Sequence, residues 1–464
     1  MKRFGLIAIA IFYSIVKDFA AELPSDDVIR QILTDRVGNN ENDVGIIVKI
    51  VTPAGERVIS HGHRHAGDAG PLDGDTVFEI GSVTKVFTAL VLADMVQRNE
   101  AALADPVAKY LPPSLRVRTR NNRPITLLDL ATHTSGLPFM PENAPPLNDP
   151  AAAKYSSGDL ARFVANYQPR RDAGSQWDYS NIGYWILSEA LAARAGNNFE
   201  DLVRKRVIAT LGLTNTDFSI SQKMKSDAAQ GHDSSLKPAP SVSSMAIYSL
   251  MPTAGGLYST ANDLGKLLAV AMGVHSSPLS DAIKLTLDKR RPTGGSEQQA
   301  LGWSVVGNGD DEIIYRDGGT YGFASSIAFD RKQRIGVVVL SNQNGSIDDI
   351  ARHLLRQDIP LKTAAKTSHT EITIDPTVLD RYVGRYEVKG EGIFTVARED
   401  NFLTIESPAE WGLPKLRIHP ETNRDFFAAE LPLRITFQSD AGDHITGFLI
   451  YPPNGNKALS AQKQ

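Results

Sequence analysis

The chain of 464 residues contains no cysteine. This absence excludes disulfides, thiolate metal sites, a cysteine nucleophile and a lipidated N-terminal cysteine. An excess of one charge is also lacking: the net charge is −4 and the pI about 6.2, so nucleic acid is not expected as a partner. What is present is the composition of a globular protein, 42% hydrophobic and 22% charged, long enough for two or three domains.

Long hydrophobic runs are scarce, and one stands at the N-terminus. Two basic residues precede an apolar run at 4–16, which is too short to cross a bilayer but typical of a signal peptide. Ala20 and Ala21 offer a cleavage site. We therefore predict a signal peptide at 1–21 and a periplasmic or secreted protein. The alternative is an uncleaved anchor. Peripheral contact with a membrane is a separate possibility among the expected partners.

The next part of the chain has an α/β pattern. Alternating apolar residues predict two strands at 44–61 and further strands from residue 301 onward. A mainly helical region, roughly 100–275, lies between them, and a helix at 347–355 closes this part. We therefore expect an α/β domain over 22–359, whose sheet takes strands from both ends.

The last part of the chain has a β pattern. The segment 360–375 is polar and rich in Thr and Lys, which predicts a linker. Many short runs of alternating residues follow at close spacing and indicate a small closed β-barrel, which we assign to 376–455. The aromatic residues of this part are interpreted as the barrel core.

The motif Ser-x-x-Lys occurs four times, at Ser14, Ser82, Ser234 and Ser460, and is weak evidence alone. Of these serines, only Ser82 begins a predicted helix that is apolar nearly all round. Helical spacing puts Lys85 one turn away, on the face of the Ser82 hydroxyl. A buried lysine is costly unless it is paired or has a task. An amine whose pKa is lowered by burial can accept a serine proton.

Two further motifs have suitable chemistry, although each is weak in isolation. In a Tyr-Ser-Asn stretch, Tyr179 could act as a base beside a cationic lysine, and the amide of Asn181 could hold a substrate amide. A glycine-containing stretch ends a predicted strand, where its backbone can approach a ligand and its N–H groups can face an oxyanion. This stretch consists of Arg316, Asp317, Gly318 and Gly319.

The three motifs, in this order, resemble the signatures of the penicillin-recognising serine enzymes. More narrowly, the chain resembles the class C β-lactamase and D,D-carboxypeptidase family, and flanking stretches such as ITLLDLATHTSGLP and TAGGLYSTANDL are similar to it as well. The resemblance covers residues 27–357 and implies the β-lactamase/penicillin-binding-protein fold, an antiparallel sheet flanked by helices with an inserted helical region. The C-terminal part resembles the lipocalin-like barrel appended to some of these enzymes.

The resemblance also implies roles for individual residues. Ser82 would be the nucleophile that forms an acyl-enzyme, Lys85 would lower the pKa of that serine, and Tyr179 would pass the proton to the leaving group. Asn181 would bind the side-chain amide of the substrate. The N–H groups of Ser82 and Gly319 would form the oxyanion hole. Neither a cofactor nor a metal is implied.

Arg316 and Asp317 depart from the family pattern, which has Lys or His and often Thr at these positions. Arg316 cannot relay a proton, but it can grip a carboxylate at two points. Asp317 beside it would repel that carboxylate, neutralise Arg316 or attract a substrate amine. The departure weakens the expectation of efficient β-lactam hydrolysis more than that of acyl transfer.

Four histidines invite other interpretations. His61, His63 and His65 alternate, so their imidazoles could converge on a metal if they shared one strand face. The metallo-hydrolase pattern His-x-His-x-Asp-His is not met, however, and an exposed hairpin loop is favoured. His133 is interpreted as a structural residue behind the active site.

The sequence thus predicts an exported serine hydrolase that acts through an acyl-enzyme. Its expected substrates are D-amino-acid peptides, as for a D-alanyl-D-alanine carboxypeptidase/endopeptidase, or β-lactams. The alternative within the same fold is an esterase or a D-aminopeptidase. A non-catalytic penicillin-binding sensor is a more distant alternative, which the complete set of Ser82, Lys85, Tyr179 and Asn181 disfavours. The sequence makes no prediction of oligomeric state.

Overall fold

The structure is a computed structural model that describes residues 23–37, 44–65, 72–145, 153–233, 235–345, 347–362, 369–408, 415–428, 433–451 and 458–464. The predicted signal peptide at 1–21 lies outside these residues, as does part of the predicted linker. Within the described ranges, no helix has the length and apolar character needed to cross a membrane.

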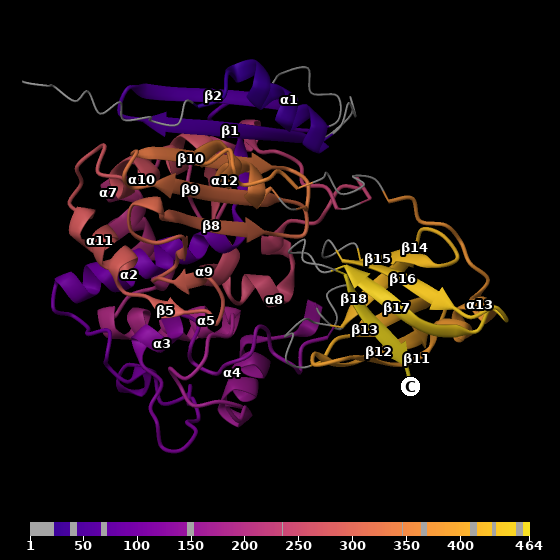
Figure 1. The fold of residues 1–464 in the computed structure, drawn as a ribbon. Coiled ribbons are helices and arrows are strands. Elements are labelled where there is room, and N and C mark those ends of the chain that lie inside the picture. The colour runs from indigo at the N-terminus through magenta and orange to yellow at the C-terminus, as the bar shows by residue number, and fades with distance from the viewer. Residues whose placement is uncertain are drawn as a thin grey trace, which may run out of the picture.

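An eight-stranded antiparallel sheet forms the centre of the larger part, in the order β2-β1-β10-β9-β8-β7-β6-β5 (Figure 1). Its strands are β1 (Gly45–Thr52), β2 (Gly55–Gly62), β5 (Arg291–Pro292), β6 (Glu297–Gln299), β7 (Ser304–Val306), β8 (Ile313–Gly319), β9 (Ala324–Asp330) and β10 (Ile335–Ser341). Ile46 pairs with Ser341, which confirms that the sheet takes strands from two distant parts of the sequence.

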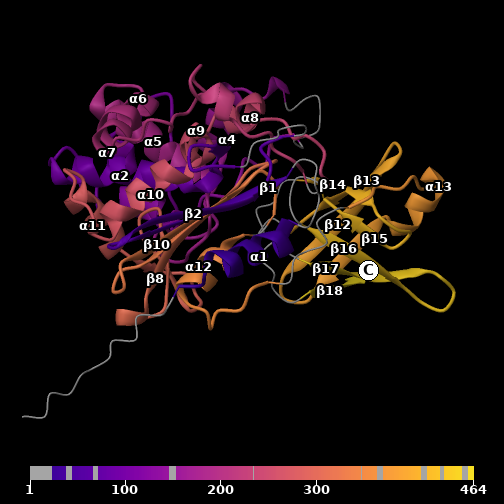
Figure 2. The same cartoon turned by 90° about the horizontal axis from the view of Figure 1, so that it is seen from above.

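Both faces of the central strands are covered, which explains why they are apolar at almost every position. In β1, Ile46 and Val48 pack into the cluster that holds residues of α1 (Asp26–Val37) and α12 (Asp348–Leu355). Ile47 and Val51 point the other way, into the cluster with α2 (Thr84–Gln97) and α10 (Ala261–Ala271). Figure 2 shows these two helix layers on opposite sides of the sheet. Side-chain alternation along a strand accounts for the division.

A helical region lies between β2 and β5, as predicted. A two-stranded sheet of β3 (Val77–Glu79) and β4 (Tyr258–Thr260) accompanies it. The remaining helices here are α3 (Leu127–Ala131), α4 (Ser157–Asn166), α5 (Asn181–Ala195), α6 (Phe199–Val203), α7 (Ala209–Leu211), α8 (Ala246–Ser249), α9 (Pro252–Gly255) and α11 (Ser280–Asp288). Their apolar side chains and those of α2 form one core on the face of the sheet opposite to α1 and α12.

The C-terminal part is a closed eight-stranded barrel that follows α13 (Pro376–Leu379), and it confirms the predicted architecture. Its strands are β11 (Gly384–Val388), β12 (Gly392–Glu399), β13 (Phe402–Glu406), β14 (Leu416–Pro420), β15 (Asp425–Phe427), β16 (Arg434–Ser439), β17 (Ile445–Tyr451) and β18 (Leu459–Lys463). Packed aromatic rings fill its interior, among them Tyr386, Phe437 and Phe448.

The barrel extends beyond residue 455, where the sequence prediction ended it. β18 pairs with both β17 and β11 and closes the ring. This strand was missed because Leu459 and Ala461 are its only apolar residues, which is too short a pattern to recognise. Ala461 nevertheless points into the core and is fully buried.

Candidate active site

Ser82 lies in a single 3-10 turn, η1 (Gly81–Val83), which leads directly into α2. Gly81 has a φ of +46° and packs so closely on Gly319 that a Cβ at Gly81 would lie 2.5 Å from the Gly319 carbonyl oxygen. Only glycine meets both demands without strain. This turn therefore places the half-buried Ser82 hydroxyl where β8 ends.

Lys85 is completely buried, and its ammonium group has three acceptors. Nζ lies 3.0 Å from Ser82 Oγ, 2.7 Å from Asn181 Oδ1 and 2.6 Å from the Ala254 carbonyl oxygen. Burial lowers the pKa of Lys85 to about 8; the nearby phenol of Tyr179 opposes this effect, and Arg316 reinforces it. These contacts account for a lysine inside an apolar helix.

Tyr179 completes a cluster around the Ser82 hydroxyl. Its phenol oxygen lies 2.8 Å from Ser82 Oγ, and the Arg316 guanidinium donates to the same oxygen at 2.5 Å. Burial alone would raise the pKa of Tyr179, but the positive charges of Arg316 and Lys85 outweigh it and the pKa is lowered. The phenolate form is thus easier to reach than for an ordinary tyrosine.

Arg316 points from β8 into the helical layer and is only 5% exposed. Its Nε donates to the Ser82 carbonyl oxygen at 3.3 Å, and its guanidinium lies 5.1 Å from the centre of the Tyr179 ring. From its chemistry, this side chain could grip a substrate carboxylate at two points. In the structure its nitrogens instead donate hydrogen bonds to the Ser82 carbonyl oxygen and the Tyr179 phenol oxygen.

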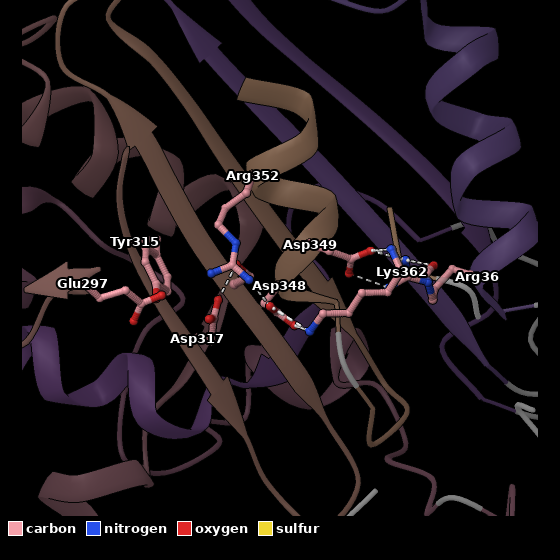
Figure 3. Close-up of polar contacts among 9 residues, drawn as sticks. Arg36, Glu297, Tyr315, Asp317, Asp348, Asp349, Arg352 and Lys362 are labelled. Carbon is pink, nitrogen blue, oxygen red and sulfur yellow. Dashed lines mark hydrogen bonds and ion pairs between the residues drawn. The ribbon is translucent and has the colours of Figure 1, made fainter. Parts of the chain in front are cut away.

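Asp317 is not brought into the cluster, although it was expected to act there on Arg316 or on a charged group of the substrate. Successive side chains of a strand point to opposite faces, so Asp317 leaves β8 on the side of α1 and α12. There it accepts a hydrogen bond from Ser326 Oγ at 2.7 Å and faces Arg352 and Asp348 of α12 (Figure 3). Burial and the Asp348 carboxylate raise the pKa of Asp317 to about 6, against the opposing charge of Arg352.

Gly318 and Gly319 have different surroundings. A Cβ at Gly318 would lie 2.2 Å from the Ile80 carbonyl oxygen and 2.9 Å from the Ser82 nitrogen, so only glycine fits. A Cβ at Gly319 would meet nothing closer than the Phe323 carbonyl oxygen at 3.9 Å. The tight fit at Gly318 brings the backbone of β8 against the backbone of Ser82.

Asn181 is the first residue of α5, which Ser180 caps by accepting a hydrogen bond from the Gly183 N–H. The side-chain oxygen of Asn181 accepts from Lys85, while its Nδ2 donates to Met140 Sδ at 3.4 Å. A thioether is a weak acceptor. The Asn181 amide therefore keeps most of its capacity to donate to a substrate.

Sequence reasoning missed two of these contacts. Ala254 contributes a backbone carbonyl, which has no side-chain signature, although it lies in the quoted stretch TAGGLYSTANDL. Met140 stands a few residues after another quoted stretch, but an isolated methionine carries no signal of a polar contact.

The three alternating histidines do not share a strand face. β2 ends at Gly62, so His61 lies in the strand whereas His63 and His65 lie beyond it. Across the described ranges, no group of three or more His, Asp or Glu side chains has an arrangement that could hold a metal ion.

A serine flanked by a buried lysine and a tyrosine, at the end of an interior strand of an antiparallel sheet covered by helices, defines a Ser-x-x-Lys serine hydrolase. Comparison with known proteins agrees. The family model described as Beta-lactamase matches residues 30–359, and the chain belongs to this family. The predicted family resemblance, fold and enzyme class are thereby confirmed.

Two relatives illustrate the range of the family. A Beta-lactamase of Escherichia coli K12 is 28% identical over 360 residues, which cover 70% of this chain and 91% of the relative. The D-alanyl-D-alanine-carboxypeptidase/endopeptidase AmpH of the same organism is 26% identical over 333 residues, which cover 66% and 83%. A solved class C beta-lactamase in complex with cefoxitin has the same fold, with a TM-score of 0.60 and 23% identity over 72% of this chain and 97% of that one.

Proposed function

We propose that this enzyme cleaves D-alanyl peptides through an acyl-enzyme on Ser82 and that β-lactams acylate the same serine. The observation that carries the proposal is the double contact of Ser82 Oγ, at 3.0 Å from Lys85 Nζ and 2.8 Å from the Tyr179 oxygen. A nucleophile within hydrogen-bond reach of an activated base is what covalent catalysis requires. The two relatives named above support the substrate class.

Acylation begins with a proton transfer. The Tyr179 phenolate takes the Ser82 proton as Oγ attacks the substrate carbonyl carbon, and the carbonyl π electrons move to its oxygen. Lys85 and Arg316 stabilise the phenolate before the transfer. The N–H groups of Ser82 and Gly319 are assigned to the developing oxyanion, which the close approach of the two backbones at Gly318 supports.

The tetrahedral intermediate collapses when its carbonyl re-forms and the bond to the leaving group breaks. Tyr179 returns its proton to the leaving nitrogen and is a phenolate again. A water then gives its proton to Tyr179 and attacks the ester carbonyl. Cleavage of the ester returns the proton to Ser82 Oγ, so the enzyme is regenerated and one water is consumed.

An esterase or D-aminopeptidase remains the second candidate, and one observation favours it. Peptide C-termini and β-lactams both carry a carboxylate near the scissile bond. The cation of β8 that could grip this carboxylate, Arg316, is buried and serves Tyr179 and Ser82. Asp317 is acidic and lies on the other face of the sheet, so it cannot bind this carboxylate.

The test is intact-protein mass spectrometry with benzylpenicillin, combined with release of D-alanine from a D-alanyl-D-alanine peptide. We expect a mass gain of one penicillin that is absent in Ser82→Ala but retained in Ser460→Ala, a matched Ser-x-x-Lys serine in the barrel. Turnover of simple esters without D-alanine release or adduct would favour the esterase. A stable adduct without any turnover would point to a sensor.

We also propose that residues 1–21 direct export. The basic start and apolar run of the N-terminus support this proposal. N-terminal sequencing of the protein recovered from the periplasm or medium tests it, because a chain that begins near residue 22 is expected. Recovery of the full-length chain with the membrane fraction would favour the uncleaved anchor.

A further inference from the structure

His133 lies behind Tyr179 with a backbone conformation that is uncommon for residues other than glycine. Its φ is +56°, in the left-handed region that histidine enters more often than most other residues, and its side chain is completely buried. Strained residues of this kind persist when the surrounding structure over-determines them, and they cluster at functional sites.

Two hydrogen bonds tie His133 to the chain on both sides of Tyr179. The N–H of Asp178, just before Tyr179, donates to the His133 carbonyl oxygen at 2.7 Å. The N–H of Ser180, just after Tyr179, donates to His133 Nδ1 at 3.1 Å. The backbone of the tyrosine is thus fixed at both of its neighbours by one residue.

The imidazole also contacts the phenol directly. The centres of the His133 and Tyr179 rings are 4.2 Å apart and their planes differ by 33°. On another side the ring meets Tyr184 at 5.0 Å. The tyrosine side chain therefore packs on an imidazole that is itself held in place.

The hydrogen bond from Ser180 fixes the protonation state of His133. Because Nδ1 accepts, the neutral ring carries its proton on Nε2, and this atom is buried without a partner in the described part of the chain. Burial, together with the positive charges of Arg316 and Lys85, holds the pKa of His133 well below its usual value. Protonation at Nδ1 would break the bond to Ser180.

We infer that His133 is a positioning residue for the reaction, because its Nδ1 and carbonyl oxygen hold the backbone on either side of Tyr179 and set the direction of the phenol toward Ser82. This role goes beyond the structural interpretation made from the sequence. It rests on the proposed function, in which Tyr179 moves the proton.

Two variants separate the hydrogen bond from the bulk of the ring. His133→Asn places a side-chain oxygen where Nδ1 stood and tolerates a positive φ, whereas His133→Ala removes the acceptor. We expect His133→Asn to keep kcat within about threefold of wild type and His133→Ala to lose about tenfold or more in kcat with little change in KM. The acid limb of the pH profile should shift in His133→Ala alone.

Two measurements keep the test independent of turnover. Tyrosinate absorbance of the full-length variants, with Tyr179→Phe as reference, follows the ionisation of Tyr179 and should shift in His133→Ala. Nitrogen NMR of wild type should show a neutral imidazole with its proton on Nε2 from pH 5 to 8. Both measurements can be made even if the enzyme cleaves no D-alanyl peptide, so failure of the proposed function and failure of this inference are distinguishable.

A proton on Nδ1, or titration of His133 between pH 5 and 8, would overturn the inference. It would also fail if His133→Asn and His133→Ala had equal kcat and unshifted Tyr179 ionisation and differed only in thermal stability. In that case His133 would be structural alone. If His133→Ala does not fold, the inference is tested by the imidazole tautomer in the NMR spectrum of wild type and by the kcat of His133→Asn.

Discussion

Arg316 and Asp317 are neighbours in sequence, but their side chains leave β8 on opposite faces of the sheet. Arg316 donates to Tyr179 and Ser82, whereas Asp317 accepts from Ser326 and faces α12. The acidic residue therefore neither neutralises Arg316 by direct contact nor stands at the serine. The departure from the family pattern concerns two separate regions of the molecule.

The first prediction follows from this separation. Asp317→Asn should leave kcat/KM within about threefold of wild type, because Asp317 is not part of the cluster. Arg316→Met should lower kcat/KM by about a hundredfold or more, since it removes a cation that holds the Tyr179 phenolate. Steady-state kinetics of both variants on one substrate decide; a large loss in Asp317→Asn would contradict the arrangement.

The second prediction concerns stability and pH. The folded pKa of Asp317, about 6, is above the value of 3.8 for an ordinary aspartate, so the folded state binds this proton more tightly. Stability contributed by Asp317 therefore rises as pH falls from 6 to 4 and is lost as pH rises through 6.

Asp317→Asn lacks this dependence and keeps an oxygen for Ser326. Urea unfolding at pH 4 and pH 8 should show the variant gaining stability relative to wild type at the higher pH, by about 1 kcal/mol or more. An equal difference at both values would mean that Asp317 is ionised normally in the folded protein.

The third prediction tests the contact between β8 and the serine turn. Gly318→Ala would place a methyl group within 2.2 Å of the Ile80 carbonyl oxygen and should cost about 1–3 kcal/mol in unfolding free energy, together with loss of acylation. Gly319→Ala is the matched control for stability, because its methyl group would meet nothing closer than the Phe323 carbonyl oxygen at 3.9 Å. Thermal melting compares the two variants, and equal melting temperatures would refute the contact at Gly318.

The fourth prediction identifies the base. Lys85 has a pKa of about 8 and is cationic below that pH. If its charge supports the Tyr179 phenolate, kcat/KM falls as pH rises above 8. Lys85→Arg keeps the charge at higher pH, so its kcat/KM should not fall above pH 8, although its maximal rate is lower than that of wild type. A rate that instead rises through pH 8 would assign the proton transfer to the neutral amine of Lys85.

The fifth prediction concerns Met140, whose sulfur occupies the Asn181 donor at 3.4 Å. A substrate amide oxygen is a stronger acceptor and competes with the thioether for the NH2 group of Asn181. Met140→Ala should raise the preference for substrates with an amide beside the scissile bond by about fivefold. The kcat/KM ratio of one substrate pair, with and without that amide, measures the change, and an unchanged ratio would place Met140 outside the substrate path.

Sequence periodicity was sufficient for six strands of the sheet and for the buried helix after Ser82, but not for the short β5 and β6, which precede residue 301. β1 and β10 are apolar at nearly every position because helices cover both faces, and α2 is apolar nearly all round because it is buried from Thr84 to Met95. The family motifs indicated which of four similar serines to follow. These features are local, so a single sequence contains them.

What could not be predicted depends on contacts across the fold. The Ala254 carbonyl accepts from Lys85, but every residue has a carbonyl, and only tertiary structure selects one. The placement of Asp317 did follow from a rule available in advance, the alternation of side chains along a strand. It was missed because the Arg-Asp-Gly-Gly stretch was treated as one unit.

The pairing of Ile46 with Ser341 constrains how the chain is made. During synthesis, β1 emerges long before β10, the strand that fills the place between β1 and β9. Until then β1 and β2 form a ribbon with an open, strongly apolar edge, which is a risk for aggregation. Folding of the enzyme is therefore expected to be largely post-translational, and fragments that stop before residue 335 should need a chaperone to remain dispersed.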